Sequence, residues 1–124
     1  MQAYLWISLG AVLGAALRYG ISRWATRITS VAFPFGTLLI NTSGSLLLGF
    51  FLVWTTERVL ADPRWRLLVA IGFCGSYTTF SSYAFETVAY FEHGHWSLLA
   101  ANVVANNFFS LAAVVAGAAL ARWL

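Results

Sequence analysis

The sequence has few charged residues and no lysine. Only 9% of its 124 residues are charged, and seven arginines against four acids give a formal net charge of +3 at pH 7. A basic balance can indicate nucleic-acid binding, but these arginines flank long apolar segments. We therefore interpret them as anchors at a membrane interface, and we expect no nucleic-acid partner.

Cysteines and metal-ligating residues are also scarce. Cys74 is the single cysteine, so the chain cannot form an internal disulfide bond. His93 and His95 lie close together, but no third metal ligand is evident beside them, and a solvated turn is the better interpretation. The sequence offers no set of nucleophile, base and orienting group, so we expect that the protein is not an enzyme.

Hydrophobic residues, by contrast, make up 60% of the chain, which is more than a soluble domain of this length carries. Four segments lack charge altogether, at residues 1–17, 28–56, 67–85 and 96–121. Each is near or above the ~18 residues of a membrane-spanning helix. The sequence predicts an all-α integral membrane protein with four transmembrane helices, at about 3–25, 34–56, 66–91 and 97–122.

The arrangement of these segments in the membrane follows from their connections and flanks. Residues 1–124 are expected to form a single domain, because the connections are short. We expect no removable signal peptide, since the first segment lacks a basic start and Arg18 follows it in place of a cleavage site. The arginines show only a weak bias toward the side of the 57–66 loop. Two interpretations stay open: insertion in both orientations with pairing into an antiparallel dimer, or one orientation fixed by that loop.

Small residues recur at helical spacing and mark close contacts between helices. Gly10 and Gly14 form one such pair, Ser45 and Gly49 form another, and Gly117 belongs to a third group in the last segment. The spacing does not decide whether these faces pack within one chain or between two chains.

The second apolar segment contains a polar stretch around Asn41. Thr37 lies four residues earlier and therefore on the same helical face. An unpaired amide at bilayer depth costs a few kcal/mol, so Asn41 needs a partner. It either bonds a neighbouring helix, which is the commoner role, or donates to a dehydrated anion.

The third apolar segment is the most informative. Residues 72–83 read Gly-Phe-Cys-Gly-Ser-Tyr-Thr-Thr-Phe-Ser-Ser-Tyr, and so combine glycines, hydroxyls and aromatic rings within a membrane-length segment. Polar groups at that depth are tolerated inside protein or beside a water-filled path. Gly72 and Gly75 permit an unwound backbone, which would free carbonyls for a cation and amides for an anion. Phe80 could offer the positive edge of its ring to an anion.

Together these motifs resemble those of a known family, the Fluc/CrcB fluoride channels. Gly-Thr-Leu-Leu-Ile-Asn at 36–41, followed by Gly44, and the segment 72–83 resemble the two hallmark segments of that family. Gly-Ala-Ala-Leu-Arg-Tyr at 14–19 is similar to its first-helix motif. The resemblance covers the whole chain in length, number of spans and order of motifs.

The resemblance implies a fluoride-selective channel that exports fluoride passively down its electrochemical gradient and relieves fluoride toxicity. It implies a multi-pass protein of the bacterial cytoplasmic (inner) membrane. The third helix would be broken within the bilayer, and two chains would form an antiparallel, dual-topology homodimer with two pores. The pore residues that it implies are Asn41, Phe80, Thr37, Ser81, Ser82 and Ser110, with Arg18 near the vestibule. A structural sodium ion would be held at the dimer interface by the backbone carbonyls of Gly75 and Thr78.

The sequence also departs from the family pattern. Tyr83 stands where a second pore phenylalanine is usual, and we expect it in the pore with an added hydroxyl. Ser76 replaces a common second glycine of the break. Asn102, Asn106 and Asn107 make the last helix unusually polar, and they either bridge helices or line the vestibule.

One alternative function stays open at this point. A small proton-coupled exporter of the four-helix dimeric type would need a carboxylate within the membrane that binds substrate and proton in turn. Glu86 is the only candidate, and it lies toward the end of the third helix. Its other roles would be to accept hydrogen bonds from nearby hydroxyls such as Ser82, or to face a water-filled vestibule.

Overall fold

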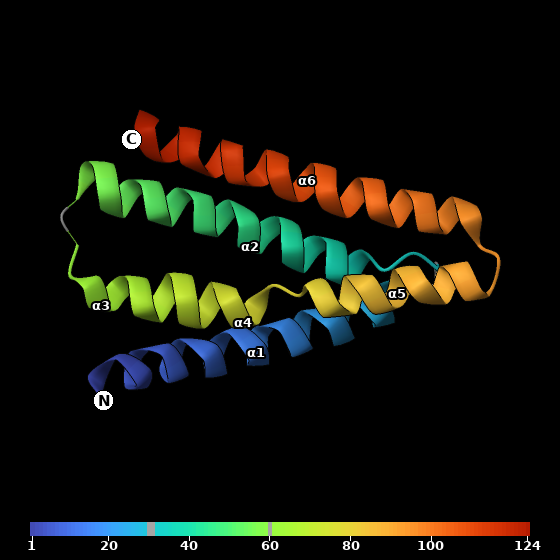
Figure 1. The fold of residues 1–124 in the computed structure, drawn as a ribbon, viewed down its shortest axis with the longest axis horizontal. Helices are drawn as coiled ribbons and strands as arrows, with labels where there is room; N and C mark the ends of the chain where they lie inside the picture. The colour runs from blue at the N-terminus through green and yellow to red at the C-terminus, as the bar shows by residue number, and fades with distance from the viewer. Residues whose placement is uncertain (30–31, 60) are drawn as a thin grey trace.

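The computed structural model describes residues 1–29, 32–59 and 61–124, and all regular elements in this part of the chain are helices. Figure 1 shows them lying side by side along one long axis, with short connections at the two ends of the molecule. α1 (Gln2–Ile28) and α6 (Trp96–Trp123) are continuous. α2 (Phe35–Val53) runs on into a π-helical turn, η1 (Trp54–Arg58).

The third apolar segment forms several shorter pieces. α3 (Pro63–Trp65), η2 (Arg66–Cys74) and α4 (Gly75–Tyr77) follow one another directly, and α5 (Phe80–Glu92) begins after an interruption. Thr78 (φ −74°, ψ 157°) and Thr79 (φ −149°, ψ 111°) are extended there, and Figure 1 shows them as a thin link between α4 and α5. The predicted break in the third helix is therefore present.

Within the described residues, three helices are long and apolar enough to cross a membrane: Gln2–Ile28, Phe35–Arg58 and Trp96–Trp123. Their bounds differ from the predicted ones by at most three residues. The predicted span at 66–91 is not among them, because the break leaves no piece of 18 residues or more.

The break does not lie at the glycines from which it was predicted. Gly75 has helical backbone angles (φ −63°, ψ −30°) and precedes the break. Gly72 instead lets the third helix approach α1, because a Cβ atom there would lie 2.5 Å from the Ile7 carbonyl oxygen. The break therefore lies near Gly75, as expected, but neither glycine is itself unwound. The extended backbone falls on two threonines, whose β-branched side chains favour such geometry.

Glycines set the contacts between the helices of this chain. A Cβ atom on Gly10 of α1 would lie 2.0 Å from the Leu68 carbonyl oxygen of the third helix. A Cβ atom on Gly117 of α6 would lie 2.2 Å from the Leu46 carbonyl oxygen of α2. These two small-residue faces, left open by the sequence, therefore pack within one chain.

Large apolar side chains lie exposed on α5 and α6. Among those more than 60% exposed are Phe80, Phe85, Phe108, Leu111 and Val115. Ala112 and Ala116 lie among the last three and line a shallow apolar groove on α6 with them, which we call the α6 groove. Such exposure is unfavourable in water and suits contact with lipid or with another subunit.

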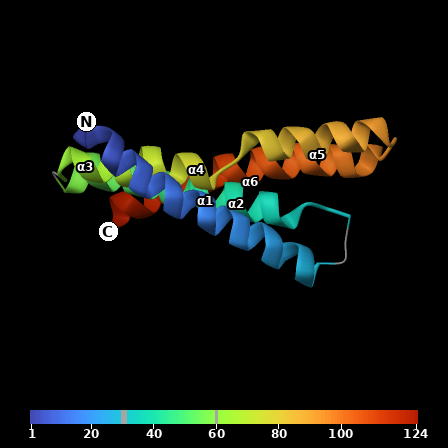
Figure 2. The same ribbon diagram turned by 90° about the horizontal axis from the view of Figure 1, so that it is seen from below.

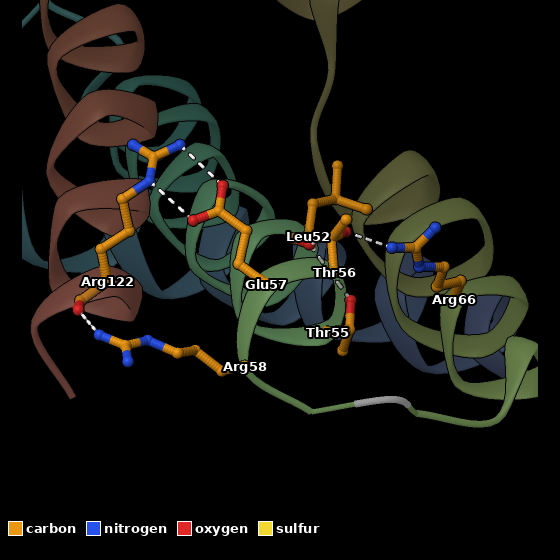
Figure 3. A network of polar contacts seen from close by, with 7 residues as sticks. All are labelled: Leu52, Thr55, Thr56, Glu57, Arg58, Arg66 and Arg122. Atoms are coloured by element: carbon orange, nitrogen blue, oxygen red, sulfur yellow. Dashed lines mark hydrogen bonds and ion pairs between the residues drawn. The ribbon is translucent and has the colours of Figure 1, made fainter.

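Polar contacts close the end of the molecule that carries α3 and, as Figures 1 and 2 show, both chain termini. Arg122 of α6 donates to both carboxylate oxygens of Glu57, at 3.0 Å each. Arg58 donates to the backbone carbonyl of Arg122, and Arg66 donates to the Thr56 hydroxyl (Figure 3). Glu57, Arg58 and Arg122, which we call the terminal clasp, join the end of α6 to the end of η1.

Candidate functional site

One side chain from α2 holds the break in the third helix. Asn41 Nδ2 donates to the Thr79 carbonyl oxygen at 3.0 Å, and Asn41 Oδ1 accepts the Thr79 amide N–H at 2.8 Å. These bonds satisfy a peptide group that has left the helix, and an unpaired polar group in lipid costs several kcal/mol. A residue outside the third helix therefore stabilises the break at Thr79.

The break frees backbone carbonyls. In a continuous helix the Gly75 carbonyl would accept the N–H of Thr79, but Asn41 takes that N–H. The N–H of Ser82 is the helical partner of the Thr78 carbonyl, and it donates to Thr79 Oγ1 at 3.2 Å. Both carbonyls that were predicted to hold sodium have therefore lost their helical donors to other acceptors.

A buried series of side-chain amides leads away from Asn41. Asn41 Nδ2 also donates to Asn106 Oδ1 at 3.1 Å. Asn106 Nδ2 donates to Asn102 Oδ1 at 2.8 Å, and Asn102 Nδ2 donates to Thr87 Oγ1 at 3.0 Å. Asn102 is 0% exposed and Asn106 is 4% exposed. This asparagine ladder (Asn41, Asn106 and Asn102) joins α2, α6 and α5, so its two α6 members bridge helices.

A cavity of about 290 Å³ lies beside the break, and we call it the aromatic cavity. Phe80 and Tyr83 line it, with ring centroids 5.3 Å apart and ring planes inclined at 63°. The residues of the predicted site that line it are Asn41, Thr78, Phe80, Tyr83 and Ser110. Asn107 lines it too and donates from Nδ2 to the Tyr83 hydroxyl at 3.2 Å. The described residues around this cavity supply neutral polar groups and ring edges but no charged side chain.

A second cavity of about 290 Å³ is lined by Thr37, Ser82 and Glu86, and we call it the carboxylate cavity. Thr37 Oγ1 donates to Glu86 Oε1 at 2.6 Å, so the partner of this acid is Thr37 rather than Ser82. Glu86 Oε2 is buried, and no donor from the described residues reaches it. A neighbouring cavity of about 210 Å³ is lined by Arg18 and shares Ser22 and Ser82 with the carboxylate cavity. Arg18 therefore lies next to the carboxylate cavity.

The structure divides the predicted pore residues into two groups. Thr37 and Asn41 were expected to offer their hydroxyl and amide donors along one line, but they line different cavities. A spacing of four residues puts side chains on one face of a helix, yet about 6 Å apart along its axis. That distance lets Thr37 contact α5 at Glu86 while Asn41 contacts the break at Thr79.

Hydroxyl groups connect the two cavities. Thr79 lines the aromatic cavity, and its Oγ1 donates to the Oγ of Ser82, which lines the carboxylate cavity, at 3.1 Å. Ser81 is exposed, and its Oγ lies 3.3 Å from Thr79 Oγ1. Sequence reasoning missed Thr79 and Ser22 as site residues. Ser22 could have been predicted, because it lies four residues after Arg18 and therefore on the same face of the first helix.

These features define a class of protein: a helical membrane protein with a broken third helix and two polar cavities beside the break. Residues 5–118 match the family described as CrcB-like protein, Camphor Resistance (CrcB). The chain belongs to this family, as the motifs at 36–41 and 72–83 predicted.

Several relatives match almost the whole chain. A protein of Koribacter versatilis is 60% identical over 98% of this chain and 97% of its own length. One from Legionella pneumophila (strain Lens) is 42% identical over 98% of this chain and 90% of its own length. One from a Sulfurihydrogenibium species is 40% identical over the full length of both chains. All three bear the name fluoride-specific ion channel FluC.

Proposed function

We propose that this protein is a fluoride-selective ion channel that lets fluoride leave the cell passively, down its electrochemical gradient. The observation that carries the proposal is the aromatic cavity: an uncharged space at a helix break, bordered by Asn41, Phe80 and Tyr83. The relatives named as fluoride-specific channels support it, since their similarity extends over 98% of this chain.

The chemistry of the aromatic cavity suits a small anion. Fluoride holds its water tightly, so a pore must replace that water with converging donors. Amide, hydroxyl and ring-edge groups do this without binding the ion as strongly as a fixed positive charge would. Conduction requires entry that is favourable but does not trap the ion. Arg18 carries a positive charge beside the other cavity, where it attracts anions without holding them in the aromatic cavity.

We propose a path for the ion that uses both cavities. Fluoride enters near Arg18, passes along Thr37 and Ser82, crosses the hydroxyls at the break and reaches Phe80 and Tyr83. The hydrogen bond from Thr79 to Ser82 supports this order, because it links the linings of the two cavities. Ser110 adds a hydroxyl to the lining of the aromatic cavity, and Ser81 would join the path through its contact with the Thr79 hydroxyl.

We further propose four membrane spans and an antiparallel homodimer with two pores, in the cytoplasmic membrane of a bacterium. A sodium ion at the interface between subunits fits the two freed carbonyls. Oxygen ligands suit a hard cation, and Gly75 is exposed with open space around its Cα hydrogens. When bound, the ion would neutralise the carbonyl dipoles of Gly75 and Thr78.

The second candidate is a proton-coupled exporter that uses Glu86. What favours it is the geometry of the carboxylate cavity, where one oxygen of Glu86 is bonded to Thr37 and the other is buried without a donor. A carrier of this kind would bind substrate and proton in turn at that acid.

Flux from liposomes distinguishes the two functions. Purified protein should release fluoride, and not chloride, from liposomes once a potassium ionophore dissipates the opposing voltage. The release should need no proton gradient, and the Glu86→Gln variant should also release fluoride without one. If fluoride moves only with an imposed proton gradient, and Glu86→Gln abolishes the movement, the exporter is correct and the channel is not.

A further inference from the structure

Both amide hydrogens of Asn41 are already in use within the chain. A carboxamide has two N–H donors, and here one goes to the Thr79 carbonyl at 3.0 Å and the other to Asn106 Oδ1 at 3.1 Å. An anion in the aromatic cavity can therefore accept an Asn41 N–H only if it replaces one of these two oxygens.

The bond to Asn106 is the one that can be exchanged. The Asn41–Thr79 contact is a reciprocal pair of bonds, and losing it would leave the peptide group of the break unpaired. The Asn41–Asn106 contact is a single bond. Asn106 also lines the aromatic cavity, so an anion there lies close to the oxygen that it would displace.

Asn102 holds Asn106 in place from behind. The Asn106 amide donates to both Asn102 Oδ1, at 2.8 Å, and the Asn102 backbone carbonyl, at 3.3 Å. These bonds fix the side chain with its Oδ1 toward Asn41, so the acceptor returns to the same position whenever the anion leaves.

We infer that Asn106 is a specificity-determining positioning residue, whose carboxamide oxygen competes with the anion for the second N–H of Asn41. The inference rests on the proposed function. When no anion accepts from Asn41, this oxygen satisfies a donor that would otherwise be left unpaired at a cost in free energy. An entering anion must be a stronger acceptor than an amide oxygen to replace it, and this favours fluoride over larger halides. The same competition speeds release, since the oxygen re-forms its bond as the ion leaves.

The decisive variant is Asn106→Leu, which keeps a similar volume and removes the competing oxygen. The concentration of fluoride that gives half-maximal flux should fall about fivefold, the equivalent of one net hydrogen bond of about 1 kcal/mol. The maximal flux should fall as well, because release becomes slower. Chloride flux relative to fluoride flux should rise. A half-maximal concentration that is unchanged or higher overturns the inference.

Asn102→Leu is the comparison variant. It makes the same change one helical turn earlier, at a residue that is also buried and does not contact Asn41, and it loosens Asn106 while leaving the competing oxygen in place. The half-maximal concentration should therefore fall less than in Asn106→Leu. If it falls equally, lost packing explains the effect and Asn106 has no special role.

A measurement on the unaltered protein covers the case in which Asn106→Leu does not fold. Fluoride titrated into the isotope-labelled protein in micelles should shift the side-chain amide NMR signals of Asn41 and Asn106 with one common midpoint. A shift at Asn41 with no change at Asn106 overturns the inference. The proposed function fails separately, when the unaltered protein shows no fluoride flux at all.

Discussion

At the scale of single residues, two phenylalanines on α5 provide a natural comparison. Phe80 and Phe85 are each 77% exposed and lie on the same helix. Only Phe80 lines the aromatic cavity, where its ring meets that of Tyr83. The two residues therefore share exposure and helix but differ in the role that we propose for them.

We predict that Phe80→Ile reduces fluoride efflux from liposomes about tenfold, which corresponds to losing about 1.4 kcal/mol of stabilisation from the ring edge. Isoleucine keeps much of the bulk and the apolar character, so a change in packing alone should have little effect. Phe85→Ile is the control and should leave efflux within about twofold of the original, given its place outside the cavity. Equal losses in the two variants would mean that Phe80 acts only through packing.

Residue types, more than residue partners, could be predicted from this sequence. The polar character of Asn41 at bilayer depth indicated that it needed a partner, and the structure supplies three bonds to it. The identities of its partners could not be predicted, because they are distant in the sequence; Asn106, for example, lies 65 positions away. For the same reason, Thr37 and Asn41 were expected to line one path, whereas they line different cavities. Helical spacing defines a face, but the neighbouring helices decide what that face contacts.

At the scale of helices, glycine contacts determine how closely the elements approach. Gly117 of α6 lies against the backbone of α2, where an added Cβ atom would overlap the Leu46 carbonyl oxygen. Gly20 of α1, by contrast, has no atom within 4 Å of the position of an added Cβ. Both glycines are helical, so their intrinsic helix propensities are the same.

We predict that Gly117→Ala lowers the free energy of unfolding in micelles by about 1–3 kcal/mol, because α2 and α6 must move apart. Gly20→Ala should change it by less, or raise it by up to about 1 kcal/mol, since alanine favours the helix. Denaturant titrations followed by circular dichroism measure both. Equal behaviour of the two variants would contradict the assignment of Gly117 as a contact residue.

Helix positions were more predictable than the point at which the third helix breaks. Apolar length fixed the continuous helices to within three residues, since the membrane imposes that length. The break was expected near Gly75, and the extended residues are Thr78 and Thr79, three and four positions later. Glycine makes extended backbone possible, but Asn41 supplies the bonds that hold it at Thr79, and local sequence does not reveal such a bond.

At the scale of the whole molecule, the distribution of arginines bears on orientation. Arg58 and Arg122 gather at the α3 end in the terminal clasp, where Glu57 offsets the charge of Arg122. Arg64 of the same end lies 3.9 Å from Asp62. Orientation depends on the number of arginines on each side more than on net charge, so these acids change it little. Four arginines at this end against Arg23 and Arg27 at the other are a weak bias, which is compatible with the proposal of insertion in both orientations.

We predict that a single cysteine in the 57–66 loop reacts with a membrane-impermeant reagent from both sides of the cell membrane. Val59→Cys is suitable because Val59 is exposed and carries no charge, so the arginine balance is preserved. The native Cys74 is buried and should not compete for the reagent. Ser97→Cys reports on the opposite end and should give the same two-sided pattern. Labelling of each site from one side only would contradict dual topology.

If the exposed side chains of α5 and the α6 groove are covered by a second subunit, the fraction of dimer should depend on how far the protein is diluted with lipid. Pairing would cover Phe80, Phe85 and their neighbours, but it costs translational freedom in the plane of the bilayer. In a bilayer the relevant concentration is the number of chains per lipid molecule. The same quantity of protein is therefore mostly dimeric at a low ratio of lipid to protein and mostly monomeric at a high ratio. If two subunits line each pore, flux per chain should fall as lipid is added. The lipid ratio at half-maximal flux would then report how tightly the subunits hold each other.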